Sequence, residues 1–190
     1  DIARIAGENG FGKVDGILFD LGVASFQLED SSRGLSFLRD GSLDMRLDKN
    51  LGVTGSDLVN SLPEAQLRRM FWEYSQEEDA GKIAREIVGE RLKGKIETTL
   101  QLKKIVERVK GKGGRISPST KVFMALRIAV NTEFENLEAG LLQSVGLLKN
   151  RGRLVVVSFH SGEDRLVKDF LKTQDKLNLM GVLAKKPVVP

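Results

Sequence analysis

The segment that settles the architecture of this chain reads Asp15-Gly16-Ile17-Leu18-Phe19-Asp20-Leu21-Gly22-Val23-Ala24-Ser25-Phe26-Gln27. A short apolar run ends on Asp20, and a glycine-containing loop follows it. This arrangement is typical of a buried parallel strand that presents a carboxylate at its C-terminal end, where open α/β sheets bind ligands. We therefore predict an α/β fold with a strand over residues 15–20.

A second segment with the same arrangement lies near the other end of the chain. The β-branched and apolar run from Arg153 to Phe159 leads into His160, which is the only histidine, and then into Ser161. We predict a strand over this run and a helix capped by Ser161. Two strands that both end in polar residues predict one cleft at a shared sheet edge.

Helices are predicted between these strands from apolar residues at helical spacing. The pattern Ser61-x-x-Glu64 reads as a capping box that opens the first of them. Thr98 or Thr99 is expected to cap another. The remaining helices are expected near 77–93, 118–130 and 133–148.

This order divides the chain into two predicted domains. Residues 1–51 and 113–190 form an α/β domain, and residues 52–112 form an inserted helical lobe for substrate recognition. The lobe carries the basic surplus: residues 82–115 hold eleven Lys and Arg against four Glu. Such a patch is an electrostatic footprint for nucleic-acid phosphates, although a solvated helical face explains the charge equally well.

Composition bounds the class of protein. A chain of 190 residues with 41% hydrophobic residues can bury one substantial core. The absence of cysteine excludes disulfides and thiolate metal sites and fits a reducing cytosol. No apolar run approaches the ~20 residues of a membrane span, and no signal-peptide pattern opens the chain. We predict no metal site, because the carboxylates are scattered and the single histidine has no partner at ligand spacing.

Several blocks of the chain resemble one protein family in their order and spacing. They are Asp20–Leu28, Arg33–Phe37, Asp40–Asp48, Phe123–Asn131, Gly152–Leu154, Ser158–Ser161 and Glu163–Arg165. The family is that of the MraW/RsmH-type methyltransferases, which use S-adenosyl-L-methionine to methylate N4 of a cytidine in the decoding region of bacterial 16S rRNA.

The resemblance implies a Rossmann-like class I methyltransferase domain, with 16S rRNA of the small ribosomal subunit as partner and a cytoplasmic location. The family places its first strand and a Gly-rich cofactor loop upstream of the Asp-Leu-Gly block. Only fourteen residues precede Asp15, so we expect a fragment truncated at both ends and lacking the first strands.

The resemblance also assigns candidate site residues. Asp20 and Gln27 match cofactor contacts, and Asp44 and His160 are candidate catalytic residues. Asp44 with Arg46 is equally well explained by a buried ion pair that holds its loop, and His160 by a structural hydrogen bond. Candidate RNA contacts are Arg33, Arg46, Lys103, Lys104, Arg127 and Asn131. Solvent exposure explains Arg33 more readily than RNA contact does, and a buried anchoring role explains Arg127 more readily. Trp72 is expected to pack within the lobe rather than to stack on a base.

The chemistry of this reaction sets what the site must do. Methyl transfer from a sulfonium is an in-line displacement, so positioning and electrostatics dominate. The lone pair of cytosine N4 is delocalised, so an acceptor on its N–H would help, and the base must leave its stack. The leading prediction is an rRNA cytosine-N4 methyltransferase. The alternatives are a non-catalytic RNA-binding module and a related methyltransferase with another acceptor, and a homodimer is left open.

Overall fold

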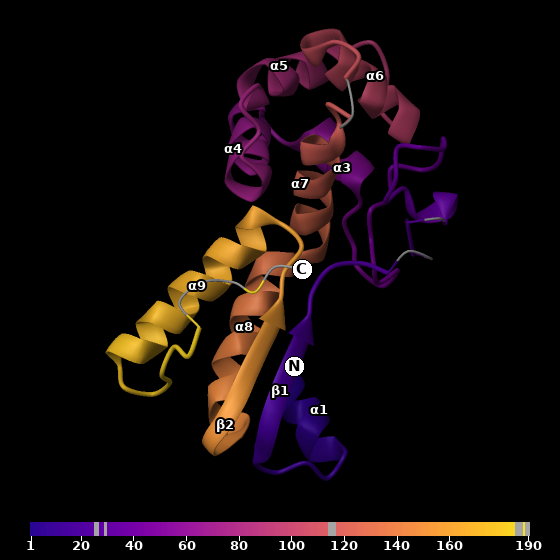
Figure 1. The fold of residues 1–190 in the computed structure, drawn as a ribbon. Helices are drawn as coiled ribbons and strands as arrows, with labels where there is room; N and C mark the ends of the chain where they lie inside the picture. Colours follow the sequence, from indigo (N-terminus) through magenta and orange to yellow (C-terminus); the bar gives the residue numbers. More distant parts are fainter. Residues whose placement is uncertain (25–26, 29, 114–116, 185–187, 189–190) are drawn as a thin grey trace. The chain divides into compact units, whose positions relative to one another are not determined.

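The chain folds into two compact units that are interleaved in the sequence (Figure 1). The computed structural model describes residues 1–24, 27–28, 30–113, 117–184 and 188. Unit 1 combines residues 1–22 with residues 134–190, and unit 2 is continuous from residue 23 to residue 133. Across the described residues, none of the helices combines the length and apolarity that a bilayer crossing requires.

Unit 1 is built on a parallel pair of strands. Strand β1 (Val14–Asp20) pairs with β2 (Leu148–Val157), so that Phe19 lies opposite Val156 and Asp20 lies opposite Val157. This confirms the predicted mixed α/β class. The first strand begins one residue before its predicted range and ends with it at Asp20. The second begins before the predicted Arg153 and ends at Val157 instead of Phe159.

One face of this sheet packs against helices. The unit contains α1 (Ile2–Glu8), α8 (Glu133–Leu147) and α9 (Ser161–Lys176). Side chains alternate along each strand, and the inward set packs on a core formed by Leu137 and Leu141 of α8 and Val167 of α9. The inward set comprises Phe19, Leu154 and Val156.

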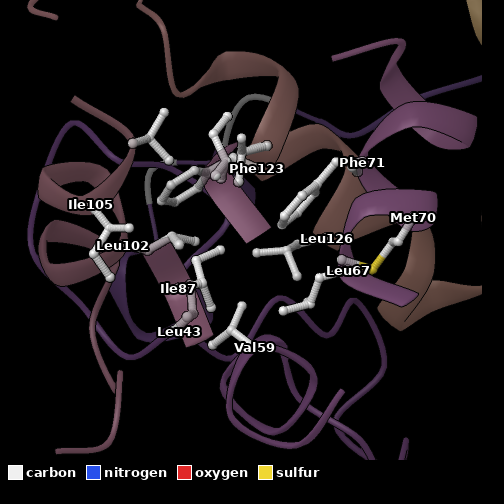
Figure 2. Packing of buried hydrophobic residues seen from close by; sticks show 14 of the residues in the cluster. Leu43, Val59, Leu67, Met70, Phe71, Ile87, Leu102, Ile105, Phe123 and Leu126 are labelled. Atoms are coloured by element: carbon white, nitrogen blue, oxygen red, sulfur yellow. The ribbon is translucent and has the colours of Figure 1, made fainter. Parts of the chain in front are cut away.

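Unit 2 is helical. Its elements are η1 (Ser31–Arg33), α3 (Gly55–Ser61), α4 (Glu64–Ser75), α5 (Ala80–Arg91), α6 (Thr99–Lys110) and α7 (Thr120–Asn131). Figure 2 shows the core, in which Phe71 from α4 and Leu126 from α7 lie among aliphatic side chains. The predicted apolar faces of α4, α5 and α6 are confirmed, since Leu67, Ile83 and Leu102 are all fully buried.

Two predicted helix caps are wrong. Pro63 occupies the N-cap of α4 with no side-chain hydrogen bond, and the capping box lies one helix earlier, between Thr54 and Asp57 of α3. The last helix is capped by His160 instead of Ser161. The cap of α6 is Thr98, which forms a reciprocal capping box with Gln101.

The helical unit is wider than the predicted lobe. It includes the irregular segment from residue 30 to residue 54, because Leu35, Leu43 and Met45 are buried in the same core as the helices. It also includes α7, whose Phe123 packs edge-on against Phe37 at a centroid distance of 5.0 Å.

Candidate functional site

The carboxyl ends of the two strands meet at one edge of the unit 1 sheet. The Leu21 N–H donates to the Val157 carbonyl oxygen at 3.1 Å, which extends the pairing past Asp20. The Asp20 side chain is exposed and forms no hydrogen bond or ion pair with any residue that the structure describes. A carboxylate without an internal partner at this edge is available to a ligand.

The turn after Asp20 requires glycine. Gly22 has a φ of +99°, which L-residues rarely adopt. A β-carbon at this position would also lie 3.3 Å from the ring of Phe159, which follows β2 and is 70% exposed. The backbone at the strand ends is therefore open beside Asp20 and bordered by an exposed aromatic ring.

His160 caps helix α9. Its Nδ1 accepts the Glu163 N–H at 3.4 Å, and the Glu163 carboxylate accepts the N–H groups of Phe159 and His160 at 2.9 and 3.3 Å. The buried Nε2 lies 3.3 Å from Glu163 Oε1, at an angle that does not make a hydrogen bond. This geometry favours the structural alternative for His160, and its catalytic role stays a prediction.

Glu163 is the charged centre of this cap. Burial alone would raise the pKa of its carboxyl, but the adjacent His160 side chain and the two backbone N–H donors outweigh burial and lower the pKa below its usual value. Glu163 is therefore held as a carboxylate at the start of α9, where the positive end of the helix dipole also favours it.

Asp44 and Arg46 form a bidentate ion pair in unit 2. Arg46 Nε donates to Asp44 Oδ1 at 2.7 Å, and Nη2 donates to Oδ2 at 2.9 Å. Nη1 donates to the carbonyl oxygens of Lys49 and Leu51. The hydrogen bonds from Arg46 lower the pKa of Asp44 even though partial burial raises it.

This arrangement favours the loop-holding alternative for Arg46, because four of the five N–H donors of its guanidinium are already engaged. Asp44 differs in one respect. Its oxygens accept three hydrogen bonds, all from Arg46, out of about four that a carboxylate can accept. Acceptor capacity on Oδ2 is therefore left, on a side chain that is 19% exposed.

Asn131 joins the end of α7 to the same loop. Its Oδ1 accepts the Leu47 N–H at 2.7 Å, and its Nδ2 donates to the Met45 carbonyl oxygen at 2.8 Å. Met45 has a left-handed backbone with a φ of +68° and a fully buried side chain. The amide of Asn131 thus fixes an unfavourable backbone conformation from a helix more than eighty residues away.

Arg33 and Gln27 are also engaged within unit 2. Arg33 donates to the Leu47 carbonyl oxygen at 2.8 Å and pairs with Asp30 at 3.3 Å. Gln27 Oε1 accepts the Ala24 N–H at 2.9 Å. Contact with RNA or cofactor therefore stays a prediction for both residues, and each would have to exchange or share an existing hydrogen bond.

The other predicted RNA contacts differ in whether residues of unit 2 already engage their side chains. Arg127 forms a bidentate pair with Glu133 at 2.8 and 3.0 Å, which agrees with an anchoring role. Lys103 lies over the ring of Phe37, 5.8 Å from its centroid. Lys104 is exposed and forms no hydrogen bond or ion pair within the described ranges, so its ammonium is accessible to a phosphate.

The basic surplus of residues 82–115 is largely neutralised inside unit 2. Arg91 donates to the carbonyl oxygens of Val59 and Leu62, and Arg115 lies outside the described residues. Ion pairs with acidic side chains engage Lys82, Arg85, Lys93, Lys103, Arg108 and Lys110. The charge count along the sequence therefore overstates the number of cations that an RNA can reach.

Two features of the site were not predicted from the sequence. Trp72 is 56% exposed, so the expectation that it packs within the lobe is wrong. The Glu163 cap was also missed, although the spacing of His160 and Glu163 matches a capping box.

Within the described residues, no group of three or more acidic or histidine side chains is placed to hold a metal ion.

These features define the class: a mixed α/β protein with a candidate ligand site at the carboxyl ends of its parallel strands. The chain belongs to the MraW methylase family, whose sequence model matches residues 1–189.

Curated relatives are similar over most of the chain. A protein of Thermomicrobium roseum is 53% identical over 175 residues, which cover 92% of this chain and 54% of the relative. A Deinococcus radiodurans protein is 45% identical over 190 residues, covering 100% of this chain and 60% of the relative. Both are named ribosomal RNA small subunit methyltransferase H. The chain thus spans somewhat more than half the length of these relatives.

Proposed function

We propose that this chain is part of a cytoplasmic S-adenosyl-L-methionine-dependent methyltransferase that modifies cytosine N4 in 16S rRNA of the small ribosomal subunit. The observation that carries the proposal is the free Asp20 carboxylate at the carboxyl ends of β1 and β2, in a chain of the MraW methylase family. In this proposal unit 1 is the part of a Rossmann-like domain that holds the methyl donor, and unit 2 holds the RNA.

The residues at the sheet edge fit such a donor. S-adenosyl-L-methionine supplies a methyl group on a sulfonium when it is bound. The Asp20 carboxylate can accept hydrogen bonds from amino or hydroxyl groups of that ligand. Gly22 leaves the adjacent backbone uncovered by a side chain of its own, so a ligand can approach closely.

The polar residues of the Asp44 loop have separate roles in the proposal. The acceptor capacity left on Asp44 Oδ2 suits the N–H of an exocyclic amine, because accepting that bond stabilises positive charge developing on nitrogen. Arg46 and Asn131 are positioning residues that fix the carboxylate and its loop. His160 and Glu163 fix the start of α9 behind the strand ends.

Calorimetric titration with S-adenosyl-L-methionine tests the donor site. Asp20→Asn should weaken binding at least about tenfold, the order expected when one charge-assisted hydrogen bond is lost. Asp15→Asn is the matched control, since Asp15 lies on the same strand with its side chain 87% exposed. Equal binding by the two variants would contradict the assignment of Asp20 and favour a non-catalytic RNA-binding module.

Mass spectrometry of digested rRNA tests the acceptor. Small subunits incubated with the protein and methyl donor should yield N4-methylcytidine, and Asp44→Asn should lower the yield. Methylation at another atom would instead identify a related methyltransferase with a different acceptor.

A further inference from the structure

An exposed tryptophan stands on the outer face of unit 2. Trp72 is the only tryptophan of the chain and belongs to α4, whose opposite face buries Leu67 and Phe71. Its ring borders an open groove of about 450 Å³ at the junction of α4 and α5. The indole is more than half exposed, although burying it would be favourable, so a partner can gain this contact.

The groove contains one cation that has no internal partner. Arg68 precedes Trp72 by one helical turn, is exposed, and forms no hydrogen bond or ion pair with the described residues. Its methylene stem passes Gly81, where a β-carbon would lie 3.4 Å from Arg68 Cδ. The neighbouring Arg69 is paired with Glu73 at 2.8 Å.

The two acidic residues that line the groove do not prevent it from binding an anion. Glu77 is 1% exposed, and both its oxygens accept from Lys110 at 2.7 Å, so its charge is compensated. Glu78 also lines the groove and is exposed, so solvent screens its charge as it screens that of Arg68. Lys121 lies nearby, donating to the carbonyl oxygen of Gln76 at the end of α4.

We infer that this groove binds an unstacked base of the RNA substrate, with the base on the Trp72 ring and Arg68 at an adjacent phosphate. A flat aromatic surface beside a free guanidinium is the combination that binds single-stranded RNA without reading its sequence. The inference rests on the proposed function, because that function makes RNA the partner of unit 2.

A protein partner fits this groove less well. The apolar lining beside Trp72 consists of Ala65, Ala80 and the glycine at position 81. Hot spots of protein interfaces are surrounded by further well-packed side chains, which these small residues do not supply. Stacking of a base needs only the indole ring and free space over its face. The small residues beside Trp72 leave that space open.

Tryptophan fluorescence and RNA affinity test the inference. A single-stranded RNA oligonucleotide of small-subunit rRNA sequence should quench the tryptophan emission of the intact chain. Trp72→Ala should weaken its binding about 5- to 150-fold, which corresponds to the ~1–3 kcal/mol of one base–aromatic stack. Trp72→Phe should retain most of the affinity, since the flat ring is kept.

The contribution of Arg68 is tested by salt dependence. Arg68→Gln should reduce the slope of log affinity against log salt by about 0.7, the value for one phosphate contact on a single strand. The matched control is Arg85→Gln, which removes an exposed arginine from the adjacent helix α5. Equal slopes for the two variants would contradict the phosphate contact.

Further outcomes separate this inference from the proposed function. Unquenched emission, with RNA affinity unchanged in Trp72→Ala, would overturn the groove while donor binding and methylation still supported the function. Quenching by RNA, together with equal donor binding by Asp20→Asn and Asp15→Asn, would support the groove and count against the proposed donor site. Trp72-dependent binding to the separated proteins of the small subunit, but not to its RNA, would identify a protein partner and overturn the inference.

Discussion

Breaking the ion pair between Lys110 and Glu77 should destabilise unit 2 by about 3 kcal/mol. Glu77 is almost fully buried, and Lys110 supplies two of its hydrogen bonds. In Lys110→Met the carboxylate keeps only the Asp79 N–H at 3.0 Å. Two charges 2.7 Å apart attract by about 6 kcal/mol at an effective dielectric constant of 20, and desolvation offsets part of this.

Urea denaturation followed by tryptophan fluorescence measures the free energy of unfolding. The single tryptophan lies in unit 2, so its emission reports on the unit that contains the ion pair. Lys112→Met is the matched control, because Lys112 is exposed and forms no ion pair with described residues, and its effect should stay within about 0.5 kcal/mol.

A double variant distinguishes lost pairing from lost packing. Adding Glu77→Gln to Lys110→Met removes the uncompensated buried charge, so it should recover about half of the lost stability. The reasoning would be refuted if Lys110→Met cost less than about 1 kcal/mol. It would also be refuted if the double variant were no more stable than the single one.

Three other substitutions test separate parts of the structure. Asp44→Asn should cost about 2 kcal/mol at pH 7, because it removes a charge-assisted pair with Arg46. Since the folded pKa of Asp44 is lowered, this stability is present above the unfolded pKa and is lost as pH falls through the folded value. The difference in unfolding free energy between Asp44→Asn and the parent chain should therefore shrink below about pH 4. A difference that stays constant in urea titrations down to pH 3 would contradict this expectation. Asn131→Ala should cost about 2–3 kcal/mol by leaving the Leu47 N–H unpaired, and hydrogen exchange at that amide should accelerate. An unchanged Leu47 exchange rate would count against it. Gly89→Ala should stabilise unit 2 by about 0.5–1 kcal/mol, because a β-carbon there meets no atom within 4 Å in a helix interior. A lower urea midpoint would be the opposite of the expected result.

The elements of the fold follow from local sequence patterns. Helices α4, α5 and α6 were predictable because apolar residues recur at helical spacing, and β1 because its apolar run ends at Asp20. The cap errors have a local cause as well. For α9, both His160 and Ser161 are polar, and the pattern alone does not fix which one adopts the extended N-cap backbone. For α4, the predicted box places the N-cap at Ser61, two residues before the Pro63 that occupies it.

Local sequence patterns did not predict which site residues are paired with other side chains and which are exposed. The link from Asn131 to the Met45 loop joins positions distant in sequence, and so does the pair of Lys110 with Glu77. A charge count treats each lysine or arginine as available, whereas folding pairs many of them with acids from other helices. The exposure of Trp72 likewise depends on which face of α4 the rest of unit 2 covers.

The interleaving of the two units has a consequence for protein synthesis. Strand β1 leaves the ribosome before unit 2, whereas the strand β2 that pairs with it is complete only at Val157, after the whole of unit 2. At ~5–20 residues per second, β1 waits on the order of ten seconds for β2, while the sequence of unit 2 is already complete at residue 133. Unit 2 can therefore fold first, and during that interval the apolar residues of β1 are a target for chaperones.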